Sequence, residues 1–163
     1  MTVFLSVAAP AAPVARGPAI LSAAQNLFLH LERGERIDTP LLRAVMETAF
    51  CASDSAGAWD WKVAYEACEV AAVLFLRKFG RALFRKSVSP AARLSMLAKV
   101  AGLLPTHTRR SEESQELQQF STPVPLGLAV LTAAAITPDD IVLEPSAGTG
   151  LLAILASMVG GSL

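Results

Sequence analysis

A short loop near the end of the chain combines one acid with two glycines. Glu144 follows the β-branched run 141–143, and residues 145–150 (Pro-Ser-Ala-Gly-Thr-Gly) lead into an apolar segment that begins at Leu151. This order of strand, acid, glycine-rich turn and helix is typical of the opening of a doubly wound α/β sheet, whose ligand crevice lies beyond the strand's carboxyl end. A carboxylate there favours a ligand with positive charge. Glycines let the backbone approach that ligand because they have no Cβ atom.

Two phosphate-binding interpretations of this loop fit less well. A P-loop needs Lys and then Ser or Thr after its last glycine, whereas Leu151 and Leu152 follow Gly150. A dinucleotide fingerprint matches the letters of residues 148–153, but it turns directly after its strand, and here four residues intervene. An acid at the strand end would also repel a pyrophosphate.

Two segments resemble motifs of a known enzyme family. Residues 144–150 resemble motif I of the class I methyltransferases, which use S-adenosylmethionine. Upstream, residues 119–123 (Gln-Phe-Ser-Thr-Pro) resemble motif X of the family that methylates the N6 amine of adenine in DNA, and the order and distance of the two motifs match that family. The chain is similar, more broadly, to the methyltransferase region of bacterial strawberry-notch-like methyltransferase/helicase proteins. The motif resemblance covers residues 118–163.

The resemblance implies a binding site for S-adenosylmethionine with two sides. Phe120, Thr122 and Pro123 would line the cofactor from motif X, and Glu144 would lie near its methionine amino group. The loop residues that would approach the cofactor are Pro145, Ala147, Gly148 and Gly150. An ordinary strand-to-helix turn is the alternative explanation of the two glycines.

The other motifs of the family are absent from the sequence. The family holds the ribose of the cofactor with an acid at the end of its second strand, and the flipped adenine with an Asn/Asp-Pro-Pro-Tyr/Phe motif. No acid follows Glu144, and neither Asn-Pro-Pro nor Asp-Pro-Pro occurs. We therefore expect an incomplete methyltransferase domain, a truncated fragment with no catalytic residue of its own. Whether the chain is an enzyme stays open.

A basic block is the second feature that points to a partner. Residues 77–110 hold nine Lys or Arg and no acid, residues 111–163 hold six acids and no base, and the whole chain is neutral. Basic surfaces meet phosphate-rich partners, although solvated helix faces carry similar charge. The residues expected to contact DNA are Arg77, Lys78, Arg81 and Arg85. The block also supports an alternative function, a non-enzymatic helical module that binds DNA or a protein and carries a vestigial methyltransferase tail.

Helices must position both features. Apolar residues at three- and four-residue steps predict helices over 18–31, 39–51, from Ala58 into the basic block, 90–104 and 124–135. Cap-plus-proline starts are expected at Asp38, Ser89 and Thr122. In the fourth helix the predicted buried residues are Leu94, Leu97, Ala98, Ala101 and Leu104. The run 141–143 predicts a buried strand without a partner elsewhere in the chain.

The expected fold is mainly α. A helical unit over 18–104 would be followed by the first strand, loop and helix of a Rossmann-like α/β domain over 118–163. Residues 1–17 are expected to be disordered, and residues 105–117 to form a linker.

Composition excludes several classes of protein. With 53% hydrophobic and 17% charged residues the chain is not disordered as a whole, and its two cysteines cannot form a disulfide scaffold. No apolar run reaches the length of a membrane span, and the apolar residues 1–15 lack the basic start of a signal peptide. We expect a cytoplasmic protein with free thiols. His30 and His107 have no partners at ligand spacing, so no metal site is expected.

Overall fold

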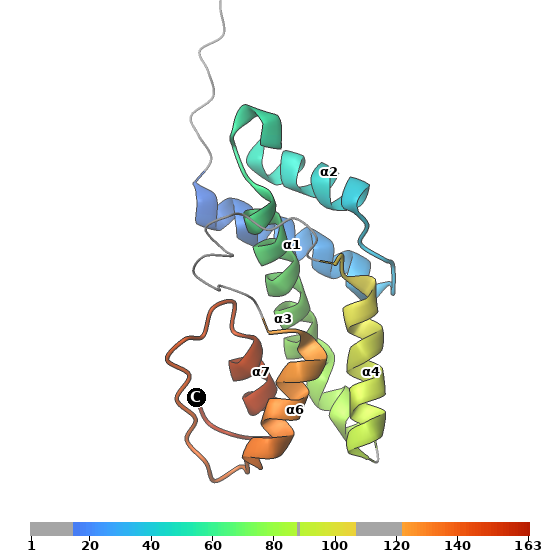
Figure 1. Ribbon diagram of the computed structural model, residues 1–163, viewed down its shortest axis with the longest axis vertical. Helices are drawn as coiled ribbons and strands as arrows, with labels where there is room; N and C mark the ends of the chain where they lie inside the picture. The colour runs from blue at the N-terminus through green and yellow to red at the C-terminus, as the bar shows by residue number, and fades with distance from the viewer. Residues whose placement is uncertain (1–14, 88, 107–121) are drawn as a thin grey trace, which may run out of the picture.

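The computed structural model describes residues 15–87, 89–106 and 122–163, which form a mainly α-helical structure (Figure 1). Residues 1–14 lie outside the described residues. So does the segment 107–121, which contains His107, most of the predicted linker and Phe120. The described helices are α1 (Arg16–Glu32), α2 (Thr39–Phe50), the short 3₁₀ helix η1 (Asp54–Ala56), α3 (Trp61–Lys86), α4 (Pro90–Leu103), α6 (Val124–Ala134) and α7 (Leu151–Met158). Because α1 begins at Arg16, helical structure starts two residues before the predicted helix and includes Gly17.

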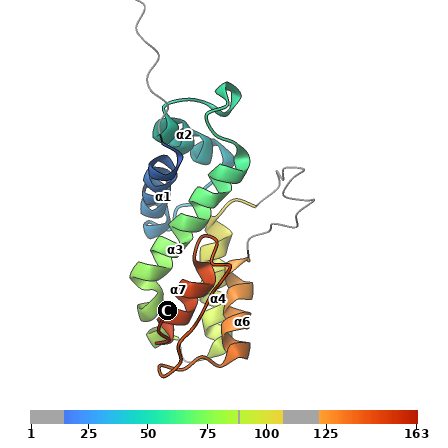
Figure 2. The ribbon, with the colours of Figure 1, turned by 90° about the vertical axis from the view of Figure 1, so that its left-hand side faces the viewer.

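The long helix α3 joins two groups of helices. Its 26 residues run through the molecule, with α1 and α2 against its first half and α4, α6 and α7 around its second half (Figures 1 and 2). No described helix is both long enough and apolar enough to cross a bilayer.

Side-chain caps explain where three helices begin. The carboxylate of Asp38 accepts a hydrogen bond from Leu41 N at 2.9 Å, and the hydroxyl of Ser89 accepts one from Ala92 N at 3.2 Å, which confirms both predicted starts. The third helix begins at Trp61 and not at Ala58, because Asp60 supplies its cap.

The predicted cap at Thr122 is wrong. The N-cap of α6 is Pro123, which makes no side-chain cap bond, and the helix begins at Val124 with Pro125 in its first turn. Proline has no side-chain acceptor, so this helix end lacks the stabilisation that a capping oxygen provides. Thr122 is half-buried just before the helix.

The first hydrophobic core lies between α1, α2 and the first half of α3. Its fully buried side chains include Leu27 and Leu31 of α1, Met46 of α2 and Cys68 of α3. Small residues on α1 and α3 keep these helices close, since alanines form much of both contact faces. This core does not include α6 or α7.

The second core surrounds the other half of α3. Leu76 and Phe84 of α3 pack with Leu97 of α4, Leu128 of α6 and Leu155 of α7. The two cores therefore share one helix. The proposed boundary between a helical unit and a methyltransferase segment stays a prediction.

Two glycines let α7 approach its neighbours. A Cβ atom on Gly127 of α6 would lie 2.7 Å from Leu155, and one on Gly80 of α3 would lie 2.5 Å from Met158. A closely packed side chain fills the space that each glycine leaves, so α7 is held between α3 and α6.

The buried face of α4 is rotated from the predicted one. Leu97 is fully buried, and Val100 is buried in place of Ala98, while Leu94 is 45% exposed. Ala101 and Leu104 are half-buried. The reason is that α4 packs against α6 and α3 on one side, and none of the described helices covers the side of Leu94.

The predicted strand 141–143 is reduced to a single bridge. Ile141 pairs in parallel with Ser162, through hydrogen bonds from Val142 N to Ser162 O (2.8 Å) and from Ser162 N to Asp140 O (3.0 Å). The expectation that this segment has no partner is therefore wrong. Its expected burial is also wrong, because Ile141 and Leu143 are 88% and 87% exposed where no described element covers their face.

Candidate functional site

The glycine-rich loop connects the bridge residue Ile141 with the first turn of α7. Gly148 and Gly150 have φ values of 53° and 90°, in the left-handed region that glycine adopts without strain. A Cβ atom on Gly150 would meet no atom within 4 Å, and one on Gly148 would meet only the carbonyl of Ser146, at 3.9 Å. The turn itself therefore explains both glycines, and it also leaves open space against the backbone.

Glu144 is the acid of this loop. Its side chain is half-buried, and Oε1 accepts a hydrogen bond from Ser146 N at 3.0 Å. This is the only hydrogen bond of its carboxylate within the described part of the chain, and no Lys or Arg of that part pairs with it. The second oxygen can accept from a ligand.

The start of α7 has free backbone donors. Gly150 is its N-cap and gives no side-chain cap bond, so the N–H groups of the first turn face the loop without such an acceptor. The hydroxyl of Thr149, the nearest candidate, instead donates to Glu69 of α3 at 3.3 Å. This bond ties the loop to the helical unit, and the uncapped first turn favours a negative group beside it.

The start of α6 lies at the same end of the molecule as this loop. Gly127, one turn into α6, faces Leu151, Leu152 and Leu155 of α7, while the end of α6 meets Val159 after α7. The two helices therefore run parallel (Figure 2). Of residues 119–123 the structure describes Thr122 and Pro123, which precede α6 and so lie toward the loop. The loop residues Pro145, Ala147 and Gly148 are exposed, and Gly150 is half-buried.

The four residues expected to contact DNA have different surroundings. Lys78 forms an ion pair with Glu32 and lies over the rings of Phe28 and Phe79, at 5.3 and 5.1 Å, so its charge is already compensated. Arg77 is exposed and does not line the groove that Arg81 and Arg85 share.

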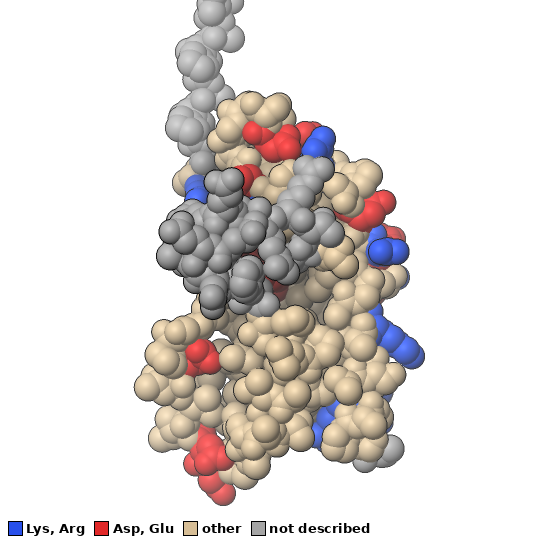
Figure 3. Space-filling model, viewed as in Figure 1, with Lys and Arg blue, Asp and Glu red and all other residues tan. Residues whose placement is uncertain are grey.

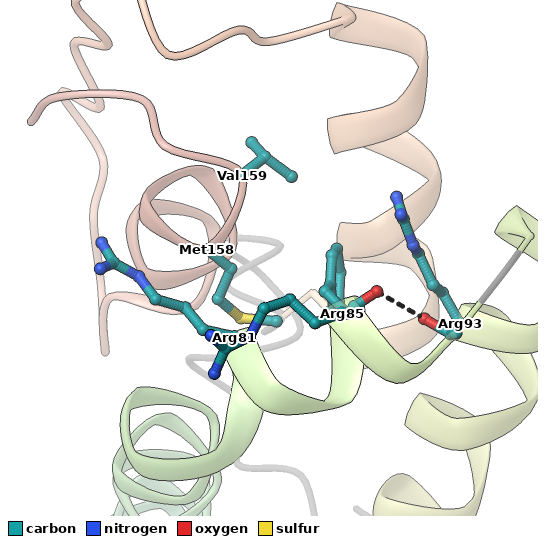
Figure 4. A pocket seen from close by; sticks show the side chains of 7 residues that line it. Arg81, Arg85, Arg93, Met158 and Val159 are labelled. Atoms are coloured by element: carbon teal, nitrogen blue, oxygen red, sulfur yellow. Dashed lines mark hydrogen bonds between the residues drawn. The ribbon is translucent and has the colours of Figure 1, made fainter.

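Arg81 and Arg85, one turn apart on α3, line one groove together with Arg93 of α4. The groove has a volume of about 750 Å³, and its other walls are Phe84, Ser87, Met158 and Val159 (Figure 4). Arg81 Nη2 donates to the carbonyl of Ser157 at 3.2 Å, at the C-terminal end of α7 where a cation is favoured.

The charges of the two candidate surfaces are separated in space. On the lower part of the face in Figure 3, carboxylates lie over the segment between α6 and α7, and basic side chains lie over α4. The acids of that segment are Asp139, Asp140 and Glu144. Among the residues that the structure describes, no group of three or more His, Cys, Asp or Glu side chains is arranged to hold a metal ion.

Two residues of these surfaces escape sequence reasoning. Glu69 lies 80 positions before Thr149, and no local pattern links them. Arg93 belongs to the basic block, but only the packing of α4 against α3 brings it beside Arg85. The sequence signal for Arg93 is that the basic block, residues 77–110, contains no acid.

Comparison of the chain with protein-family models, with curated proteins and with solved structures gives no match.

Proposed function

We propose that residues 118–163 form the cofactor-binding start of a methyltransferase domain of the adenine-N6 DNA family, with S-adenosylmethionine as cofactor. One observation carries this proposal. The helices α6 and α7 run parallel, so the residues that precede α6 and the glycine-rich loop that precedes α7 lie at the same end. Thr122 and Pro123 of motif X precede α6, and motif I is that loop. The described residues of motif X thus lie at the same end of the two helices as motif I, which supports a ligand shared by the two motifs.

The pairing of Ile141 with Ser162 supports the Rossmann-like part of the proposal. A parallel pair needs a long crossover, usually a helix, and here the crossover contains α7. In a complete sheet the loop after Ile141 would lie at the carboxyl end of the first strand, where open α/β sheets bind their ligands.

The donor set at the loop fits the amino-acid part of S-adenosylmethionine. The carboxylate of Glu144 would bind the ammonium group, because its second oxygen has no partner in the described residues. The uncapped first turn of α7 would bind the carboxylate group. Gly148 and Gly150 leave the space for both contacts. When bound, S-adenosylmethionine supplies the methyl group and a sulfonium charge.

The proposal assigns cofactor binding, and not methyl transfer, to these 163 residues. The sequence contains no Asn-Pro-Pro or Asp-Pro-Pro motif with which to hold an extruded adenine. No acid after Glu144 is present to bind the ribose, so we expect weak binding.

A charge-matched pair of variants tests the assignment of Glu144. Glu144→Gln should weaken S-adenosylmethionine binding about tenfold, because it removes a hydrogen bond between two charged groups. Asp139→Asn changes the same charge at an exposed position outside the loop and should leave binding unchanged. Saturation-transfer NMR on the whole chain measures both, and equal binding by the wild-type chain and Glu144→Gln would contradict the assignment.

The second candidate function is a non-enzymatic helical module that binds DNA. The arginine groove between α3, α4 and α7 favours it. Phosphate binding weakens steeply with salt, whereas binding of S-adenosylmethionine in the loop should depend on salt far less. The salt dependence of binding therefore distinguishes the two functions in the same protein.

A further inference from the structure

The arginine groove is an uncompensated cationic surface. Arg81 and Arg85 come from the last turns of α3 and Arg93 from the first turn of α4. None of the three forms an ion pair with a carboxylate in the described ranges. Lys78, on the same helix, does have such a partner. Three guanidinium groups in one groove without an acid should attract an anion.

Arg93 is held in place and has an unsatisfied donor. Its guanidinium lies over the ring of Phe84, with Cζ 4.9 Å from the ring centre, and this cation–π contact holds the side chain against α3. Its Nε atom is buried and makes no hydrogen bond in the part of the chain that the structure describes. The Nη groups of Arg93 make no hydrogen bond to another described residue, so they can donate to an anion in the groove.

Arg81 is also oriented before any ligand binds. One nitrogen of its guanidinium donates to Ser157 O, which leaves its other N–H groups for a ligand. Arg85 is exposed and has no hydrogen bond to another described residue. The groove therefore combines two oriented arginines with one adaptable arginine. Guanidinium groups bind phosphate oxygens with two parallel hydrogen bonds, which makes phosphate the anion that best suits the groove.

The spacing of the arginines favours an extended anion. Figure 4 shows the three guanidinium groups spread along the groove and not converging on one point. A single phosphate could meet only one or two of them, whereas a chain of phosphates could meet all three. We propose that the groove between α3, α4 and α7 binds the phosphodiester backbone of DNA through Arg81, Arg85 and Arg93. That the polyanion is DNA rests on the proposed function. The arginine geometry itself does not depend on it.

The test measures binding of a short fluorescein-labelled DNA duplex to the 163-residue chain by fluorescence anisotropy, at several salt concentrations. Arg85→Gln and Arg93→Gln should each weaken binding about tenfold, since each removes charged hydrogen bonds to phosphate. Each should also reduce the slope of log K against log salt by about 0.9. Arg36→Gln is the matched control. Arg36 is exposed, far along the chain from the groove, and has no hydrogen bond or ion pair with another described residue.

Three results would overturn the proposal. The first is unchanged binding by Arg85→Gln, whose exposed side chain can be replaced without disturbing the fold. The second is an equal loss in Arg36→Gln, which would show that net charge alone decides binding. The third is a chain that binds inorganic pyrophosphate through the same arginines but does not bind the DNA duplex. Failure of the cofactor proposal has a separate readout, since S-adenosylmethionine would then leave the NMR signals of the loop unchanged while the anisotropy result stood.

Discussion

Replacing Leu155 by alanine tests whether α7 is docked as described. Leu155 is fully buried in the second core, and its side chain packs against Gly127 of α6. The substitution removes three carbon atoms from this core, about 2.4 kcal/mol at about 0.8 kcal/mol for each buried carbon. The cavity left behind raises the expected cost to about 3–4 kcal/mol. This is a large part of the roughly 5–15 kcal/mol that stabilises a typical domain.

The consequence should extend beyond stability. A helix of eight residues does not form alone in water, so α7 and the loop before it depend on this docking. Urea unfolding followed by circular dichroism measures the free energy of unfolding, with Leu126→Ala as control because Leu126 of α6 is 54% exposed. The control should change stability by less than about 1 kcal/mol. A loss below about 1 kcal/mol for Leu155→Ala would refute the packing of α7 between α3 and α6.

Four further experiments test other contacts. Thr149→Val should cost about 1 kcal/mol and speed amide exchange in the glycine-rich loop, because it removes the hydrogen bond to Glu69, whereas Thr149→Ser should not. Burial raises the pKa of the Cys68 thiol from 9.0 to about 12, so alkylation followed by mass spectrometry should modify the exposed Cys51 and spare Cys68 near pH 8. Since the folded pKa of Cys68 lies above the unfolded value, this thiol should contribute stability below pH 9.0 that is lost as pH rises toward 12, and a flat alkaline unfolding profile would contradict its burial. Asp38→Ala should cost about 1 kcal/mol in thermal unfolding by removing the cap of α2, and an equal cost for Asp38→Asn would argue against capping.

Local signals predict the helices of this chain well. Two signals identify α2 and α4, namely the caps at Asp38 and Ser89 and the apolar repeats before and after them. Both signals are local, since they lie within a few residues of each other. The predictions are wrong where the burial or the pairing of a residue depends on a part of the chain that is distant in sequence. The buried face of α4 depends on α6, and the bridge of Ile141 depends on Ser162 beyond α7. Neither partner can be identified from the local sequence.

The two candidate sites also differ in how much of each can be predicted from the local sequence. The acid and the glycines of the loop are visible as a contiguous pattern, and the structure gives those glycines the left-handed conformation that the turn needs. The basic block is visible only as a composition. Its separation into the compensated Lys78 and the groove arginines depends on contacts with Glu32 and α7, which are distant in sequence.

Chemical-shift mapping with S-adenosylmethionine tests the central claim most directly. Titrating the ¹⁵N-labelled 163-residue chain should shift the amide signals of residues 144–151 and of Thr122, with a dissociation constant of about 1 mM. This weak affinity follows because the absent ribose and adenine contacts would each forfeit about 1.5–3 kcal/mol from a micromolar site. S-adenosylmethionine that leaves these signals unchanged at millimolar concentration, or shifts only signals elsewhere, would contradict the proposed cofactor site.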